Sequence, residues 1–177
     1  MIQNERSIRN ELVIQAARQM MVAARTAPKG KGIDIIEMAL VTGDDKDRLA
    51  GEMRRIGTER NWMFFLRDAD NVLQAEVVMI IGTRQQMQGL NCMYCGHPTC
   101  EAKPADTPCV INSVDLGIAI GSACAKAADL KVDTRVMFSA GFAAQSLKML
   151  GDNCGGVFAI PVSATSKNPF FDRQPKI

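Results

Sequence analysis

Four of the six cysteines in this chain fall within one short segment, and their spacing suggests a metal site. They are Cys92, Cys95, Cys100 and Cys109, in the pattern C-x2-C-x4-C-x8-C. A metal ion or an iron–sulfur cluster needs several thiolates within a few ångströms, and cysteines on one loop meet at a small cost in chain-closure entropy. The segment therefore predicts a metal centre, with a [4Fe-4S] cluster as its leading occupant.

The residues between these cysteines favour tight bends. Gly96 permits a positive φ, and Pro98, Pro104 and Pro108 restrict the loop. Backbone amides that such a loop leaves unpaired can point at cluster sulfurs, where hydrogen bonds help to set the reduction potential.

Other interpretations of the cysteines stay open. Zinc accepts four thiolates, or three with His97, although structural zinc sites usually pair two short C-x2-C-like knuckles. A disulfide framework needs an oxidising compartment, and four unrelated buried thiols would cluster only by chance. We expect Cys124, in an alanine-rich run, to be a core residue, and Cys154, before two glycines, to lie in a turn.

Length and charge limit the remaining classes of function. The 177 residues suit a single domain over 1–177, with a cysteine-rich metal or cluster loop at 90–110 inside it. A formal net charge of +2, with dispersed basic residues, gives no electrostatic signature of a nucleic-acid partner. The polar amino-terminal segment and the lack of a long unbroken apolar run predict no membrane partner and a cytoplasmic location.

Hydrophobic periodicity predicts an alternation of helices and strands. Helices are expected at 5–25, at 44–60, and as a short segment at 62–66. The first has a wide apolar face made by Ile8, Leu12, Ala16, Met20 and Ala24, with Val13, Ala17 and Met21 alongside. Strands are expected at 33–42, 76–82 and 157–162, and further helices at 110–130 and 133–150. In the helix at 110–130, Gly117, Ala119, Gly121, Ala123 and Ala127 suggest a face of small residues for close helix packing. Asp44 or Asp45, and Asp133 or Thr134, are expected helix caps.

Several segments together resemble a prokaryotic family of small, uncharacterised ferredoxin-domain-containing proteins. They are the run ARTAPKGKG at 24–32, the opening GLNCMYCG of the cysteine loop, the helix DLGIAIGSA at 115–123 and the tail IPVSATSKNPFFDR at 160–173. The resemblance covers nearly the whole chain. It implies an iron–sulfur cluster but no particular reaction.

A second resemblance is to flavin-dependent nitroreductases, which are α+β proteins. It rests on the basic start Arg6, Ser7, Ile8 and Arg9, on Ala27-Pro28 at the end of the first helix, and on the glycine- and alanine-rich helix from Asp115. It implies an α+β, nitroreductase-like layered fold: a central, mostly antiparallel sheet flanked by helices, with the cysteine-rich loop inserted. It also implies a homodimer with FMN at its interface, and flavin contacts at Arg6, Ser7, Arg9, Lys29, Gly30 and Lys31. Those enzymes usually carry Ser and Asn after the Ala-Pro, where this chain has Lys29-Gly30-Lys31.

These observations predict an iron–sulfur redox protein that passes single electrons to a partner protein or to a flavin. Two other hypotheses are a zinc-stabilised structural or partner-binding protein and an FMN-dependent reductase. The sequence shows no nucleophile triad and no phosphate-binding loop, and Gly30 and Gly32 follow a helix, the reverse of a dinucleotide fingerprint.

Overall fold

The computed structural model describes residues 1–171, and these form one antiparallel sheet between two layers of helices. In chain order the elements are α1 (Glu5–Thr26), the 3₁₀ turn η1 (Gly30–Gly32), β1 (Ile36–Val41), α2 (Asp44–Glu59), α3 (Met63–Gln74), β2 (Val77–Arg84), α4 (Val110–Asp129), β3 (Asp133–Thr134), α5 (Phe138–Ser146) and β4 (Cys154–Ser163). The sheet order is β1-β2-β4-β3, and every neighbouring pair is antiparallel. The predicted mixed fold with an antiparallel sheet is confirmed.

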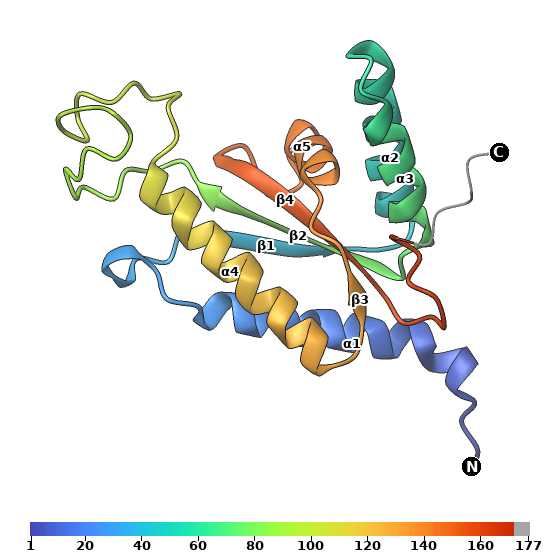
Figure 1. Ribbon diagram of the computed structural model, residues 1–177. Helices are drawn as coiled ribbons and strands as arrows, with labels where there is room; N and C mark the ends of the chain where they lie inside the picture. Colours follow the sequence, from blue (N-terminus) through green and yellow to red (C-terminus); the bar gives the residue numbers. More distant parts are fainter. Residues whose placement is uncertain (172–177) are drawn as a thin grey trace.

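The central strand β2 shows how the sequence builds the two layers. Val78 and Ile80 face a core that contains α2, α3 and α5, whereas Val77, Met79 and Ile81 face a core that contains α1 and α4. Successive strand residues point to opposite faces, and a strand covered on both faces is apolar throughout. Figure 1 shows α1 and α4 side by side on one face of the sheet, with α2, α3 and α5 on the other.

Most elements were predicted, but two residues of the predicted apolar face of α1 are not buried as expected. Val13, Ala17 and Met20 are buried, whereas Leu12 is exposed and Ile8 only partly buried. A four-residue step advances more than one helical turn of 3.6 residues, so a stripe built on that step drifts around the helix. The prediction that Leu12 belongs to the buried face was wrong.

Two predicted caps were also wrong. Asp44 and Asp45 both lie inside the first turn of α2, and the cap position is Gly43. Residues Asp133–Thr134 form β3, which pairs with β4, and the helix after it begins only at Phe138 and ends at Ser146. The β-branched residues Val132, Thr134 and Val136 favour an extended backbone, and this preference decides the conformation.

Helix α3 is longer than expected, and one charged residue, Asp68, lies on its buried face. It continues to Gln74 through Asp68, which is 4% exposed. The Asp68 carboxylate accepts a hydrogen bond from the Ser139 hydroxyl at 2.6 Å and pairs with Arg67 at 2.7 Å and Arg135 at 3.6 Å. A buried carboxylate needs such partners, and these tie α3 to α5.

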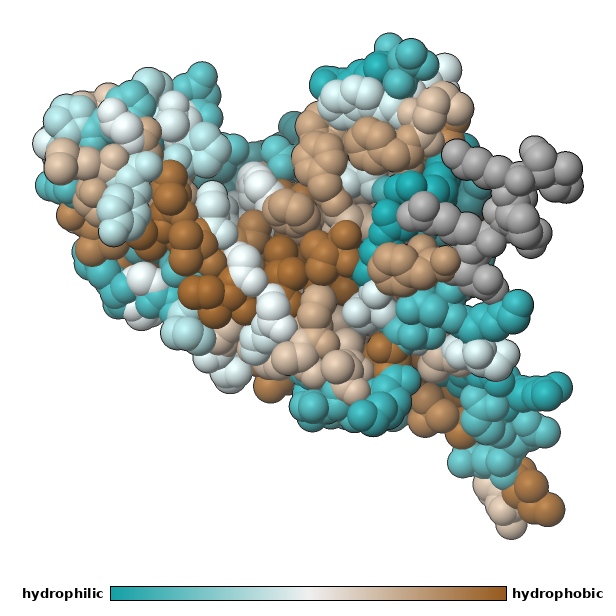
Figure 2. All heavy atoms as spheres, viewed as in Figure 1, coloured by the Kyte–Doolittle hydropathy of each residue, from teal (hydrophilic) through white to brown (hydrophobic). Residues whose placement is uncertain are grey.

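By length and composition alone, helix α4 could span a membrane. No such segment was expected from the sequence. In this fold it packs on α1 and on the sheet through Leu116, Ala119, Ala123 and Ala127. Gly117 and Gly121 lie on its exposed side, so the small residues do not share one face as predicted. On the side seen in Figure 2, apolar side chains run along α4.

Candidate metal centre

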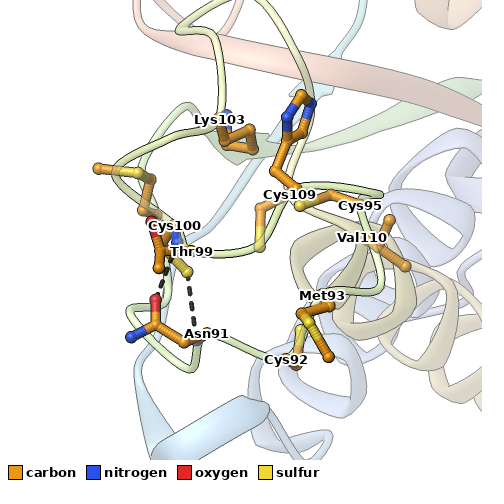
Figure 3. A pocket seen from close by; sticks show the side chains of 11 residues that line it. Asn91, Cys92, Met93, Cys95, Thr99, Cys100, Lys103, Cys109 and Val110 are labelled. Carbon is orange, nitrogen blue, oxygen red and sulfur yellow. Dashed lines mark hydrogen bonds between the residues drawn. The ribbon is translucent and has the colours of Figure 1, made fainter.

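The cysteine loop joins β2 to α4 and projects from one end of the sheet (Figure 1). Residues 85–109 form neither helix nor strand. Cys92, Cys95 and Cys100 lie within the loop, and Cys109 is the residue from which α4 starts. All four are partly buried and line a single pocket, together with His97 (Figure 3).

Tight turns bring these four residues together. Asn91, Met93 and Gly96 all have positive φ, with values of 49°, 61° and 83°. The Gly96 amide donates to the Met93 carbonyl at 2.9 Å, which closes the turn between Cys92 and Cys95. Gly96 adopts this backbone at no steric cost, as its sequence position predicted.

Asn91 holds Cys100 from two sides. The Asn91 backbone N–H lies 3.4 Å from the Cys100 sulfur and donates to it, while the Cys100 N–H donates to the Asn91 side-chain oxygen at 2.8 Å. Figure 3 shows both bonds crossing the loop. An N–H aimed at sulfur is the kind of contact that orients a metal-bound thiolate and tunes its metal.

The donor set fits a metal centre, but the loop must adjust before all ligands can bind. Within residues 1–171, no three His, Cys, Asp or Glu side chains converge closely enough to hold an ion. The shared pocket encloses only about 10 Å³. Since the loop has no ladder of backbone hydrogen bonds, it can move its sulfurs more cheaply than a helix or strand could.

Cys124 and Cys154 lie apart from this pocket. Burial raises the pKa of the Cys124 thiol in α4, and a hydrogen bond with Thr134 opposes that effect. Burial, with a smaller contribution from Glu37, raises the pKa of Cys154 to about 11. Cys154 begins β4 and is buried, so the expectation of a turn thiol was wrong.

Alkylation should separate the two classes of cysteine. In metal-free protein at pH 8, iodoacetamide should modify the four loop cysteines at least about tenfold faster than Cys154, because the thiolate is the reactive form. The raised pKa of Cys154 keeps it protonated, and its rate should climb as the pH approaches 11. Peptide mass spectrometry over time measures each site. Equal rates in folded protein would contradict this assignment.

The residues expected to contact FMN fall into two groups at opposite ends of α1. Arg6, Ser7 and Arg9 lie in its first turns, whereas Lys29, Gly30 and Lys31 follow its last residue. With 22 residues at about 1.5 Å each, α1 spans roughly 33 Å. One chain therefore does not bring the two groups to one ligand.

Most of these residues already have partners within the chain. Arg9 makes a two-point ion pair with Glu5, at 2.7 and 2.9 Å. The Lys29 ammonium donates to carbonyls at the end of α1, including that of Ala27 at 2.8 Å. Lys31 donates to the Gln88 carbonyl at 3.2 Å. The stretch after α1 thus braces the helix end and the start of the cysteine loop.

The sequence reading did not select Asp115 and Asn112 as site residues, although both were noted. Asp115 is 3% exposed, and both of its carboxylate oxygens accept the Gly30 N–H at 3.0 Å. Asn112 donates from its side-chain nitrogen to the Gln86 carbonyl at 2.7 Å. Their one signal in the sequence was that both are polar residues on the inner side of an apolar helix. Through these hydrogen bonds Asp115 fixes η1 to α4, and Asn112 fixes the start of the cysteine loop to α4.

A second, larger cavity adjoins the metal-binding loop. It has a volume of about 530 Å³ and lies between the end of β2, the start of β4 and the first turns of α4. Cys109 lines both this cavity and the cysteine pocket. No predicted flavin contact lines either of them.

Comparison of the fold with solved structures finds nitroreductases. Nitroreductase A from Vibrio parahaemolyticus superposes with a TM-score of 0.60 over 99% of this chain and 72% of that chain, at 14% identity. The NADPH:FMN oxidoreductase from Vibrio harveyi, complexed with NAD+, superposes with a TM-score of 0.59 over 92% of this chain and 63% of that chain, at 15% identity. The nitroreductase-like fold expected from the second resemblance is confirmed.

Comparison of sequences identifies the family. An uncharacterised protein from Archaeoglobus fulgidus is 39% identical over 186 residues, which cover 99% of this chain and all of that protein. Residues 105–173 match a family described as "Uncharacterized protein containing a ferredoxin domain". That match includes Cys109, and its last residues, 172 and 173, lie beyond the described part of the structure. The chain therefore belongs to this family of uncharacterised proteins that contain a ferredoxin domain.

Proposed function

We propose that this protein is an iron–sulfur redox protein whose Cys92, Cys95, Cys100 and Cys109 hold a [4Fe-4S] cluster. The observation that carries the proposal is the shared pocket: four cysteines from one loop line it, while the other two, the partly buried Cys124 and the buried Cys154, lie elsewhere. A cluster held there would supply one-electron transfer. The chain's own contribution is to ligate, to aim the Asn91 N–H at sulfur and to shield the site with the loop.

The ferredoxin-domain description of the family and the redox proteins that share the fold both support this proposal. Zinc is the second candidate, because four thiolates satisfy a tetrahedral ion and the present pocket is small. In that case the metal would stabilise the loop and no electron transfer would follow. A cytoplasmic location suits either centre, since reducing compartments keep thiols available for metals.

We also infer a homodimer that can hold FMN. Among the solved structures that share the fold, one is an NADPH:FMN oxidoreductase. The two groups of expected flavin contacts are separated by the length of α1, so one shared flavin would take Arg6, Ser7 and Arg9 from one chain and residues 29–31 from the other. Val114 and Ile118, beside Gly117 and Gly121 on the exposed side of α4, offer an apolar surface for the second copy. Electrons would then leave through the flavin or to a redox partner protein.

One anaerobic preparation tests these proposals. The ultraviolet–visible spectrum is recorded, and iron, sulfide and zinc are assayed on the same sample. A broad brown absorption that dithionite bleaches, with about four iron and four sulfide per chain, supports the cluster. A colourless protein with one zinc per chain replaces it with the structural site. A two-banded yellow spectrum that persists after metal removal supports bound flavin, and sedimentation velocity tests the dimer.

A further inference from the structure

The buried polar atoms that lack a hydrogen-bond partner gather at the base of the cysteine loop. Among residues 1–171, five buried side-chain nitrogen or oxygen atoms have no such partner. Two of them are Nε2 and Oε1 of Gln88, which is 2% exposed, and a third is the side-chain oxygen of Asn112. No other side chain in that part of the chain leaves two such atoms unpaired. Because buried polar groups in folded proteins are almost always hydrogen-bonded, an amide with neither group paired needs a physical reason.

Gln88 lies where the anchored base of the loop meets the part that can move. The Gln88 carbonyl accepts from the Lys31 ammonium at 3.2 Å, and the Asn112 side chain donates to the Gln86 carbonyl at 2.7 Å. These contacts tie the base of the loop to η1 and α4. The next residue, Gly89, has a φ of 69°, and a Cβ there would meet nothing within 4 Å. Since a glycine in open space can change its backbone angles at little steric cost, the loop beyond it can shift while its base stays in place.

The metal-free conformation therefore carries a cost that a rearranged loop can remove. A buried N–H or C=O group that has lost water without gaining a protein partner destabilises the conformation that contains it. The four cysteines have to move before they can bind one metal, because their present pocket encloses only about 10 Å³. Rearrangement of the loop thus coincides with metal binding, and it starts beside the unpaired Gln88 amide.

We propose that Gln88 makes the metal-free loop metastable, and that the metal-bound loop supplies the hydrogen bonds that the Gln88 side chain lacks. Gln88 is then a positioning residue of the metal centre, because it favours the rearranged loop without being a ligand. A metal's apparent affinity depends on the free-energy difference between the conformation it finds and the one it binds. The inference rests on the four-cysteine metal site of the proposed function, and it holds for a cluster and for zinc alike.

Gln88→Leu should act in opposite directions on the stability of the metal-free protein and on its metal affinity. Leucine places no polar group at the buried position, so the metal-free chain should unfold at a urea concentration about 0.5–1 M higher than wild type. The affinity for metal should fall at least about tenfold, because the metal-free loop no longer gains by rearranging. A residue that only held the loop together would lower the urea midpoint when replaced, so the opposite signs identify the stored cost.

Zinc is the probe for affinity, because four thiolates satisfy this ion whichever metal the cell supplies. Metal-free protein is prepared with a chelator under anaerobic conditions, and Zn²⁺ is titrated in competition with a chromophoric chelator. Gln86→Leu is the matched control, since Gln86 lies two residues away in the same loop and is exposed. This control should leave the urea midpoint and the zinc affinity close to those of wild type.

A second variant keeps the test decisive if leucine does not pack at this position. Gln88→Met retains the unbranched shape of glutamine without its polar groups, and it should shift both quantities in the same directions as Gln88→Leu. If both variants lower the urea midpoint, or if both bind zinc as tightly as wild type, the inference about Gln88 is wrong. Wild type that binds no zinc would overturn the four-cysteine site itself. Wild type that stays colourless after reconstitution with iron and sulfide, yet binds zinc with the expected differences, would overturn only the cluster.

Discussion

Replacing Cys100 with serine should lower metal affinity at least about 100-fold. Loss of an outer contact to a metal ligand typically costs 10–100-fold, and loss of a ligand costs more. Cys100 is held on two sides, because Asn91 bonds both its sulfur and its backbone N–H. Iron and sulfide per chain after anaerobic reconstitution, followed by desalting, measure the effect. The brown absorption should fall with the iron.

The matched control is Cys124→Ser. Cys124 lies in α4, outside the pocket that the loop cysteines share, and burial raises the pKa of its thiol. This variant should retain the metal content of wild type. If it loses as much metal as Cys100→Ser while circular dichroism shows both folded, then the loop cysteines are not the ligand set. If Cys100→Ser keeps its full iron content, the proposed centre is wrong.

The sequence predicted β2 and the buried stripe of α2 because their burial depends on local periodicity. Leu49, Met53 and Ile56 follow the helical repeat, and all three are buried. Asp133 and Thr134 were misassigned because two different structures suit the same residues: a cap when the chain is read alone, and a strand when the edge of β4 is available. Pairing with β4, which is distant in sequence, therefore determines that these residues form a strand.

In the candidate site, too, local features could be predicted from the sequence, whereas contacts between distant residues could not. Four clustered cysteines are a local signal, and the structure places all four around one pocket. The contact between Asp115 and Gly30 joins residues 85 positions apart, so no local pattern reveals it. The Asn112 side-chain oxygen, which is buried with no partner among residues 1–171, is likewise defined by what surrounds it in the folded chain. Residue type indicated which side chains could do chemistry, but long-range packing decided which of them meet.

The approach of α5 to β4 should make Gly141→Ala the most destabilising small substitution in the fold. A Cβ at position 141 would lie 2.1 Å from the Val157 carbonyl oxygen and 2.4 Å from the Phe158 Cα, both of them backbone atoms. The backbone of β4 cannot move aside without breaking its pairing with β2, and paired hydrogen bonds between Met137 and Ala159 fix the start of α5. We expect a loss of about 3 kcal/mol or more in the free energy of unfolding, measured by urea denaturation.

Gly51→Ala is the control, because a methyl group at this exposed position in the middle of α2 meets nothing within 4 Å. Alanine restricts the unfolded chain and favours the helix, so this variant should gain about 0.5–1 kcal/mol. The same chemical change should therefore act in opposite directions at the two sites. Should Gly141→Ala unfold at the urea concentration of wild type, the tight contact between α5 and β4 is wrong. If Gly141→Ala yields no folded protein while Gly51→Ala folds normally, the backbone clash accounts for the difference.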